Sequence, residues 1–205
     1  MTKNKNHWYD GWFYDRIIAP NQDPLFREIK NLIEPHSKVI DIGCGTGRLS
    51  FALADQCHSV LGIELSKRNI DRANIKLQQH PNDRISFLHR SLSEIRKEGQ
   101  THFDYAVLTF VIHEVNEEER INILNDAFHV ADKIIIGDYL SPKPKGFPGY
   151  ISESIEFMAG REHYKNYKNF MSAGGIYDLI DKSELKIIQK IRMQSSINHL
   201  VVLSK

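Results

Sequence analysis

The sequence Val39-Ile40-Asp41-Ile42-Gly43-Cys44-Gly45-Thr46-Gly47-Arg48 places an apolar run directly before three glycines at alternate positions. A near-continuous apolar run is typical of a β-strand that is covered on both faces. Glycine tolerates a positive φ and lets a ligand approach the backbone, and a helix that begins at once offers unpaired N–H groups to a carboxylate or phosphate. The stretch therefore predicts a strand, a ligand-binding loop and a helix.

The spacing of the glycines separates several kinds of ligand. A dinucleotide fingerprint, G-x-G-x-x-G, would need glycine where Arg48 stands, so a nicotinamide cofactor is disfavoured. The Gly-Lys-Ser/Thr ending of a P-loop is missing as well. Glu64 follows about 20 residues later, where nucleoside-binding folds place a carboxylate for the ribose hydroxyls. A solvated glutamate in a turn is the alternative, but the two features together favour a nucleoside site.

Further apolar runs alternate with helical patterns along the chain. This alternation indicates βα units around a doubly wound, mostly parallel sheet with helices on both faces. The expected strands cover residues 38–42, 59–64, 85–88, 105–110 and 133–137. The expected helices cover residues 23–33, 48–56, 67–79 and 117–128.

Capping signals mark the beginnings of three of these helices. Ser66 and Asn116 are expected N-caps, and Glu119 occupies the capping-box position after Asn116. Asp23 is expected to cap the first helix, with Pro24 at its first position.

The pattern changes after Asp138. Three prolines between residues 141 and 150 predict an extended loop. Residues 151–170 show a helical pattern that we expect to break near Gly160, and a short helix follows over 176–181. Two β-like runs, 185–193 and 199–203, predict a terminal hairpin on the sheet.

Length and composition fit one ordinary globular domain. The chain has 205 residues, with 27 Lys and Arg against 26 Asp and Glu, so no net charge steers it toward nucleic acid. Cys44 and Cys57 lack the paired spacing of a disulfide framework or a zinc site. No apolar run resembles a secretory signal or a membrane span, and we expect a cytoplasmic protein without a membrane partner.

The stretch from Asp41 to Gly47, followed by Glu64, resembles the class I S-adenosylmethionine-dependent methyltransferase family. The resemblance covers residues 37–138 as motifs and the remaining chain as topology, and it implies seven strands in the order 3-2-1-4-5-7-6 with strand 7 antiparallel. It also implies S-adenosylmethionine as cofactor, with Asp41 orienting the ammonium group, the glycines under the methionine part and Glu64 on the ribose. The resulting cofactor-binding residues are Asp41, Gly43, Cys44, Gly45, Thr46, Gly47, Glu64, Leu65, Ser91, Leu92 and Thr109.

One position departs from the family pattern. After the third strand, relatives usually carry an aspartate that accepts from the adenine amino group, whereas this chain has Ser91. A serine oxygen still accepts a hydrogen bond and the Leu92 N–H donates one, but the charge is missing.

His113 is the candidate general base. It follows the fourth strand, whose C-terminal end should face the transferable methyl group, and histidine titrates near neutral pH. The alternative is a histidine that only hydrogen-bonds the backbone of the turn. Asp104, which opens the same strand, is expected to be structural, and no metal is expected. The segment from Thr109 to Ile112 lacks the Asn/Asp-Pro-Pro-aromatic motif of enzymes that methylate exocyclic amines of bases.

Two aromatic segments are expected to cover the substrate. Residues 1–34 form a predicted N-terminal cap, in which Tyr9, Tyr14 and Arg16 are candidates, and residues 141–175 form a predicted lid. At helical spacing His163, Tyr167 and Phe170 share one face of this lid. Packing is the alternative for both segments. The candidate substrate residues are Tyr14, Asp138, Met158, His163, Tyr164 and Tyr167.

Together these features predict one domain that methylates oxygen or nitrogen on a small molecule. One alternative is an RNA or protein methyltransferase, although the near-neutral charge does not favour nucleic acid. Another is a protein that binds S-adenosylmethionine without turnover. The acceptor and the oligomeric state are not encoded in any of these motifs.

Overall fold

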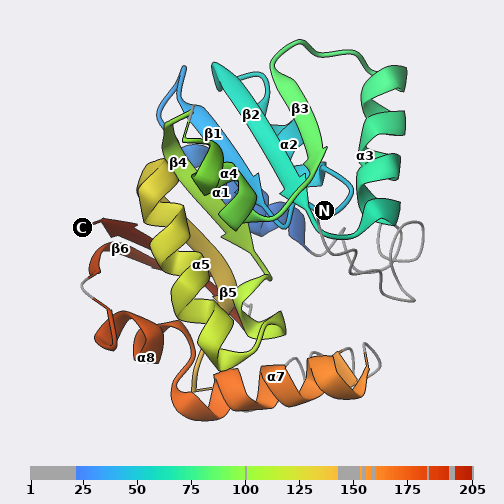
Figure 1. Ribbon diagram of the computed structural model, residues 1–205. Helices are drawn as coiled ribbons and strands as arrows, with labels where there is room; N and C mark the ends of the chain where they lie inside the picture. Colours follow the sequence, from blue (N-terminus) through green and yellow to red (C-terminus); the bar gives the residue numbers. More distant parts are fainter. Residues whose placement is uncertain are drawn as a thin grey trace.

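The computed structural model describes residues 22–99, 101–142, 153, 156–157, 160–183, 185–193 and 197–204. Its core is one seven-stranded sheet (Figure 1). The strands are β1 (Lys38–Ile42), β2 (Ser59–Glu64), β3 (Ile85–His89), β4 (Phe103–Thr109), β5 (Ala131–Tyr139), β6 (Lys186–Arg192) and β7 (Asn198–Ser204). The helices are α1 (Asp23–Leu32), α2 (Arg48–Leu53), α3 (Lys67–Gln79), α4 (Leu92–Glu98), the 3₁₀ turn η3 (Ile112–Glu114), α5 (Glu117–Val130), α7 (Arg161–Ala173) and α8 (Ile176–Asp181).

The strand order β3-β2-β1-β4-β5-β7-β6 confirms the predicted topology. Strands β1 to β5 pair in parallel, and β7 runs antiparallel between β5 and β6. The order reverses between β1 and β4, and a crevice beyond the carboxyl ends of parallel strands at such a point is where α/β folds bind ligands. The glycine loop after β1 and the turn after β4 therefore belong to one site.

The helices cover both faces of the sheet, as expected. Helices α4, α5, α7 and α8 pack on one face through a cluster that includes Ile40, Leu108 and Ile134. Helices α1 and α2 pack on the other face against Val39 and Val107. The central strands are buried on both sides, which explains their near-continuous apolar sequence.

The cap of the first helix differs from the prediction. Gln22 is the N-cap, and Asp23 is the first helical residue. The Asp23 carboxylate forms an ion pair with Arg48 at the start of α2 instead of capping its own helix. The capping side chains of Ser66 and Asn116 are confirmed by their bonds to the N–H groups of Asn69 and Glu119.

Several strand and helix bounds differ from the prediction by one or two residues, and α2 and α4 depart furthest from it. Helix α2 ends at Leu53 and not at Gln56, because Ala54 and Gln56 donate to carbonyls three residues earlier and tighten the chain into a turn. Helix α4 was not predicted. Its signal is the capping box formed by Ser91 and Glu94, three residues apart.

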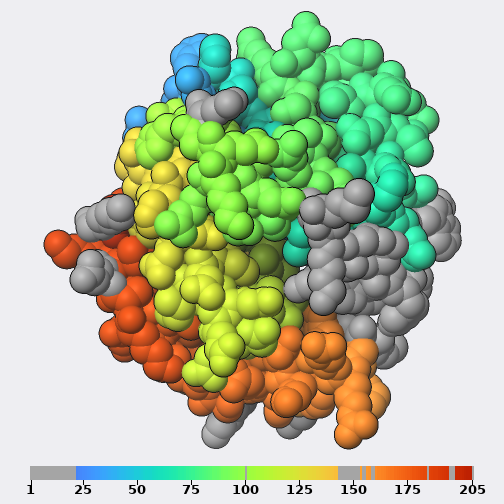
Figure 2. All heavy atoms as spheres, viewed as in Figure 1, coloured from blue at the N-terminus to red at the C-terminus, as the bar shows by residue number. Residues whose placement is uncertain are grey.

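Helix α7 lies across the carboxyl ends of β4 and β5 and contacts η3 and α5 (Figure 1). In the space-filling view it forms an orange band along the lower edge of the molecule, against the yellow-green surface of α5 (Figure 2). It begins after Gly160, whose φ of +129° confirms the predicted break. Among the described residues, no helix is long and apolar enough to cross a membrane.

Candidate functional site

The three glycines of the loop after β1 all have a positive φ: +70° at Gly43, +54° at Gly45 and +84° at Gly47. The N–H groups of Gly43 and Cys44 both donate to the Ile63 carbonyl of β2 and hold the loop against the neighbouring strand. A Cβ on Gly47 would lie 2.5 Å from the Phe87 ring, whereas a Cβ on Gly45 would meet nothing within 4 Å. Gly47 is thus required by packing, whereas none of the described residues would contact a side chain at Gly45.

Glu64 at the end of β2 folds its carboxylate back toward this loop. It accepts from the N–H of Gly45 at 3.1 Å and from the N–H groups of Leu65 and Ser66 at 2.7 and 2.8 Å. Glu64 is therefore fixed beside the glycine loop, as the sequence predicts for a ribose-binding carboxylate.

Asp41 supplies a second, fully buried carboxylate. Its Oδ2 accepts from the Ser50 hydroxyl at 2.6 Å, while Oδ1 is buried without a hydrogen-bond partner in the described part of the chain. Burial raises the pKa of Asp41 to about 7 against the opposing hydrogen bond from Ser50, and the nearby charge of Glu64 adds to the rise. A buried oxygen without a partner is costly, so this site suits a ligand with a cationic donor.

A small pocket lies beside the loop. Residues 43–46 and Thr109 line it together with Phe26 of α1. Asp41 has a buried oxygen without a partner among the described residues, and the Glu64 carboxylate contacts the same loop. The roles predicted for Asp41, Glu64 and Gly45 with S-adenosylmethionine stay predictions.

Ser91 and Leu92 lie at the start of α4. The Ser91 hydroxyl caps the helix through Glu94, and its N–H donates to the Glu94 carboxylate at 2.9 Å. Leu92 is buried in the core. The adenine contact predicted for these two residues stays a prediction.

His113 lies in the η3 turn after β4 and is 1% exposed. Its Nδ1 is 2.7 Å from Oδ1 of Asp138 in β5, and its N–H donates to the other carboxylate oxygen. The backbone N–H of Tyr139 donates to Asp138 as well. Asp138 is 1% exposed and its oxygens are engaged, so this geometry makes it a residue that orients His113.

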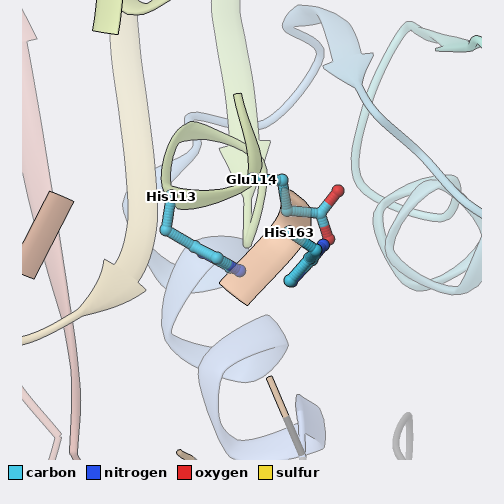
Figure 3. A group of neighbouring side chains, drawn as sticks. All are labelled: His113, Glu114 and His163. Carbon is cyan, nitrogen blue, oxygen red and sulfur yellow. The ribbon is translucent and has the colours of Figure 1, made fainter. Parts of the chain in front are cut away.

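A third buried carboxylate, Glu156, joins this pair to α7. Its Oε2 is 3.6 Å from His113 Nε2 and is hydrogen-bonded to His163 Nε2. Its Oε1 accepts from the Tyr139 hydroxyl at 2.6 Å. Glu114, next to His113, completes the group, and Figure 3 shows the His113 ring pointing toward Glu114 and His163.

The carboxylates control the protonation of this cluster. Burial disfavours the charged imidazole of His113, but attraction by Asp138 and Glu156 outweighs it and holds the pKa of His113 well above its ordinary value. Burial raises the pKa of Glu114 to about 7, although both histidines oppose the rise. With a proton on both ring nitrogens, His113 donates hydrogen bonds and cannot accept a proton.

Aromatic rings and a buried arginine surround the cluster. Tyr139 and Tyr167 lie 4.9 and 6.1 Å from His113, measured between ring centroids. Phe110, at the end of β4, adopts a φ of +58°, a strained conformation that is often found at functional sites. Arg120 of α5, 1% exposed, lies over the Phe170 ring and bridges η3 to α7.

The structure brings several of the predicted substrate residues together. His163 and Tyr167 lie on the buried face of α7, and Asp138 lies beside them at the end of β5. Tyr164 is half-buried and donates to Glu153. Tyr9, Tyr14, Arg16 and Met158 lie outside the described residues, so their roles stay predictions.

The sequence reasoning missed Glu114, Glu156 and Tyr139. Glu114 carries a signal, because it adjoins His113 in the turn after the central strand. Glu156 has only a weak one. It is seven residues before His163, and only the break at Gly160 brings their side chains together.

A family model described as a methyltransferase domain matches residues 39–133, which span β1 to the start of β5. The matched segment contains the glycine loop, Glu64 and His113.

Two curated relatives illustrate the range of similarity. The ubiquinone biosynthesis O-methyltransferase of Rickettsia typhi is 27% identical over 198 residues, covering 91% of this chain and 78% of that protein. An uncharacterized RNA methyltransferase of Mycoplasma mobile is 25% identical over 84 residues, covering 41% of this chain and 23% of that protein.

Among solved structures, the magnesium protoporphyrin IX methyltransferase of Synechocystis PCC 6803 with bound S-adenosylhomocysteine superposes with a TM-score of 0.63. The two sequences are 17% identical, and the match covers 91% of this chain and 82% of that one. At this identity the likeness establishes a common fold.

Proposed function

Because the chain belongs to the class I S-adenosylmethionine-dependent methyltransferases, we propose that it methylates an oxygen or nitrogen atom of a small molecule. The observation that carries this proposal is the enclosed polar and aromatic cluster at the carboxyl ends of β4 and β5, beside the glycine loop. The cytoplasm remains its expected compartment.

The cofactor supplies an activated methyl group on a sulfonium. In this proposal Asp41 faces its ammonium group, the loop from Gly43 to Gly47 approaches its methionine part, and Glu64 accepts from its ribose. These groups are already fixed by the sheet and by hydrogen bonds, so little order has to be created on binding.

The covered end of the sheet supports a small acceptor. Helix α7 is held against η3 by Arg120, which donates to the carbonyls of Ile112 and Asn166. His163 and Tyr167 on its inner face are 8% and 2% exposed. A covered site excludes water and suits a metabolite better than a folded macromolecule.

An RNA acceptor has weaker support. The similarity to the RNA methyltransferase of Mycoplasma mobile extends over 41% of the chain, whereas the match to the ubiquinone enzyme extends over 91%. The longer match includes the region after β5, where acceptor-binding segments are expected.

The protein's own part in the reaction is to align the acceptor with the methyl group. His113, held by Asp138, and Tyr139 offer polar atoms at this end of the sheet. The general-base role predicted for His113 requires a neutral ring.

The direct test combines binding with turnover. Isothermal titration with S-adenosylmethionine should give one site per chain, and a methyl-release assay with a panel of phenols, quinols, amines and carboxylic acids should identify an accepted class. Binding without turnover on any metabolite, together with turnover on RNA or a folded protein, would overturn the proposed acceptor. Failure to bind S-adenosylmethionine would overturn the proposed function itself.

A matched pair of variants locates the cofactor. Glu64→Gln should weaken S-adenosylmethionine binding by about tenfold or more, because it removes a charge-assisted acceptor for the ribose hydroxyls. Glu34→Gln is the control. Glu34 is an exposed glutamate that bonds Tyr105 and Lys133 near the amino ends of β4 and β5, at the opposite end of the sheet from the glycine loop. Equal affinities in both variants would contradict the assignment of Glu64.

A further inference from the structure

Two segments about 50 residues apart bring a set of metal-ligating side chains together. His113 and Glu114 come from η3, and His163 comes from the first turn of α7. One ligand atom from each of the three lies within 4.8 Å of the others (Figure 3). Glu156 adds a carboxylate oxygen 3.6 Å from His113 Nε2 and in contact with His163.

We propose that His113, Glu114, His163 and Glu156 form a binding site for a divalent first-row transition-metal ion. Two imidazoles and two carboxylates are a ligand set that such ions accept, whereas Mg²⁺ and Ca²⁺ prefer oxygen ligands alone. All four proposed ligands are side chains of this chain, and none of them lies in the glycine loop.

The distances between the donor atoms suit an ion. With metal–ligand bonds of about 2.1 Å, neighbouring donors lie roughly 3.0 to 3.4 Å apart and opposite donors of an octahedral ion roughly 4.2 Å apart. The His113–Glu156 separation of 3.6 Å is slightly larger than that of neighbouring donors, and the ligand atoms of His113, Glu114 and His163 lie within 4.8 Å of one another. An ion would draw these three residues closer together and would replace the hydrogen bond between His163 and Glu156.

Asp138 and Tyr139 hydrogen-bond two of the proposed ligands, as neighbouring residues commonly do in metal sites. A metal-bound histidine commonly donates its other ring N–H to a carboxylate, which fixes its tautomer. Asp138 lies 2.7 Å from His113 Nδ1 and so leaves Nε2 for the ion. The Tyr139 hydroxyl donates to Glu156 and orients it in the same way.

Glu114 is the most exposed of the four proposed ligands. This residue is half-buried, whereas His113, His163 and Glu156 are 1%, 8% and 5% exposed. The ion would join the turn after β4 to the start of α7, and it would hold the cover of the acceptor site in place.

A role of this metal ion in methyl transfer rests on the proposed function. Four protein donors leave positions open on a six-coordinate ion, and a hydroxyl or carbonyl oxygen of the acceptor would fill one of them. Because the ion occupies His113 Nε2, metal binding and a general-base role for His113 exclude each other.

The test uses the full chain after treatment with a chelator that is then removed. Titration with ZnCl₂, MnCl₂ and CoCl₂ separately should give one saturable site per chain for at least one ion. With Co²⁺, a visible absorption spectrum of nitrogen and oxygen coordination should develop in the same proportion. Absence of a saturable site for all three ions would overturn the proposal.

Variants decide whether this cluster holds the ion. His163→Gln and the nearly isosteric Glu114→Gln should each lower the affinity about 100-fold or more, and Asp138→Asn about 10- to 100-fold. His129→Gln is the control, since His129 lies exposed on α5 and bonds Asn125. Circular dichroism verifies that each variant is folded. Binding that survives both His163→Gln and Glu114→Gln would place the ion elsewhere and overturn the proposal.

Titration of the same samples with S-adenosylhomocysteine separates the two proposals. Nucleoside binding without metal binding overturns only the metal site. Metal binding without nucleoside binding leaves the metal site standing and overturns the proposed function.

Discussion

Gly45 and Gly99 form a matched pair for testing the cofactor loop at the level of single residues. Both have a left-handed φ, +54° and +61°, and at neither would a Cβ meet an atom of the described residues within 4 Å. Gly45 borders the pocket, whereas Gly99 ends α4. The backbone strain of an alanine is therefore similar at the two positions, and only their surroundings differ.

We expect Gly45→Ala and Gly99→Ala to lower the free energy of unfolding equally, by roughly 1 to 2 kcal/mol. Only Gly45→Ala should weaken S-adenosylmethionine binding, because its methyl group would occupy space that the ligand needs. Denaturant unfolding and isothermal titration measure the two effects. Undiminished binding by Gly45→Ala would show that the ligand does not approach this part of the loop.

Asp41 predicts a pH dependence of stability. Its pKa is about 7 in the folded protein against 3.8 as the ordinary value. Between pH 4 and 7 the folded state keeps a proton that the unfolded state has lost, so stability falls as the pH rises through this range. Above pH 7 the full cost is present, on the order of 4 kcal/mol by the conversion of a pKa difference to free energy.

Asp41→Asn should remove this cost, because the amide carries no charge and still accepts from Ser50. We expect the variant to gain stability over the wild type at pH 8 and to lose the gain near pH 4, as measured by urea unfolding at both values. Asp104→Asn serves as a control, since Asp104 is exposed and accepts from the Lys38 N–H, as the structural role predicted for it requires. A gain of equal size at pH 4 and pH 8 would contradict the charge argument.

At the level of elements, the attachment of α7 depends on Arg120. Its Nε donates to the carbonyls of Ile112 and Val115, and its terminal nitrogens donate to Asn169 and to the carbonyl of Asn166. One buried side chain of α5 thus holds both η3 and α7. A helix that covers a site needs such a link, because its own buried face is limited to a few residues.

Arg120→Met should lower the free energy of unfolding by roughly 3 kcal/mol, because several buried acceptors lose their donor. Hydrogen exchange should accelerate in α7 more than in β4 or β5. Arg96→Met is the matched control. Arg96 pairs with Asp126 at the surface and should contribute about 1 kcal/mol or less. Uniform acceleration across the sheet would show that Arg120 supports the whole fold and not α7 in particular.

At the level of the whole molecule, the proposed ligand site lies beyond the carboxyl ends of the paired strands β1 and β4, so binding should stabilise the sheet as a unit. S-adenosylhomocysteine at 100 times its Kd adds about 2.7 kcal/mol to the folded state. For a domain of this size, that gain corresponds to a rise in Tm of roughly 5 to 10 °C. Thermal unfolding measures this rise, with NADH as the control. A shift with NADH and none with S-adenosylhomocysteine would reverse the choice of cofactor made from Arg48.

The order of elements and the cofactor loop were predictable from the sequence because their signals are local. Strands β1 and β2 match their expected bounds, since apolar runs and flanking glycines lie within a few residues of each other. The same holds for α3, which begins at the Ser66 cap. The cap of α1 was assigned wrongly because Arg48, 25 residues away, attracts the Asp23 side chain.

The amino-acid sequence by itself determined the doubly wound sheet, the glycine loop and the place of Glu64, because periodicity and spacing encode these within single βα units. Tertiary structure alone decided that Glu114, His113, Glu156 and His163 share one buried cluster and that Asp138 supports His113. Side chains from three segments meet there only after the sheet has aligned the ends of β4 and β5 and Arg120 has fixed α7. The spacing of these residues in the sequence therefore does not predict that their side chains are in contact.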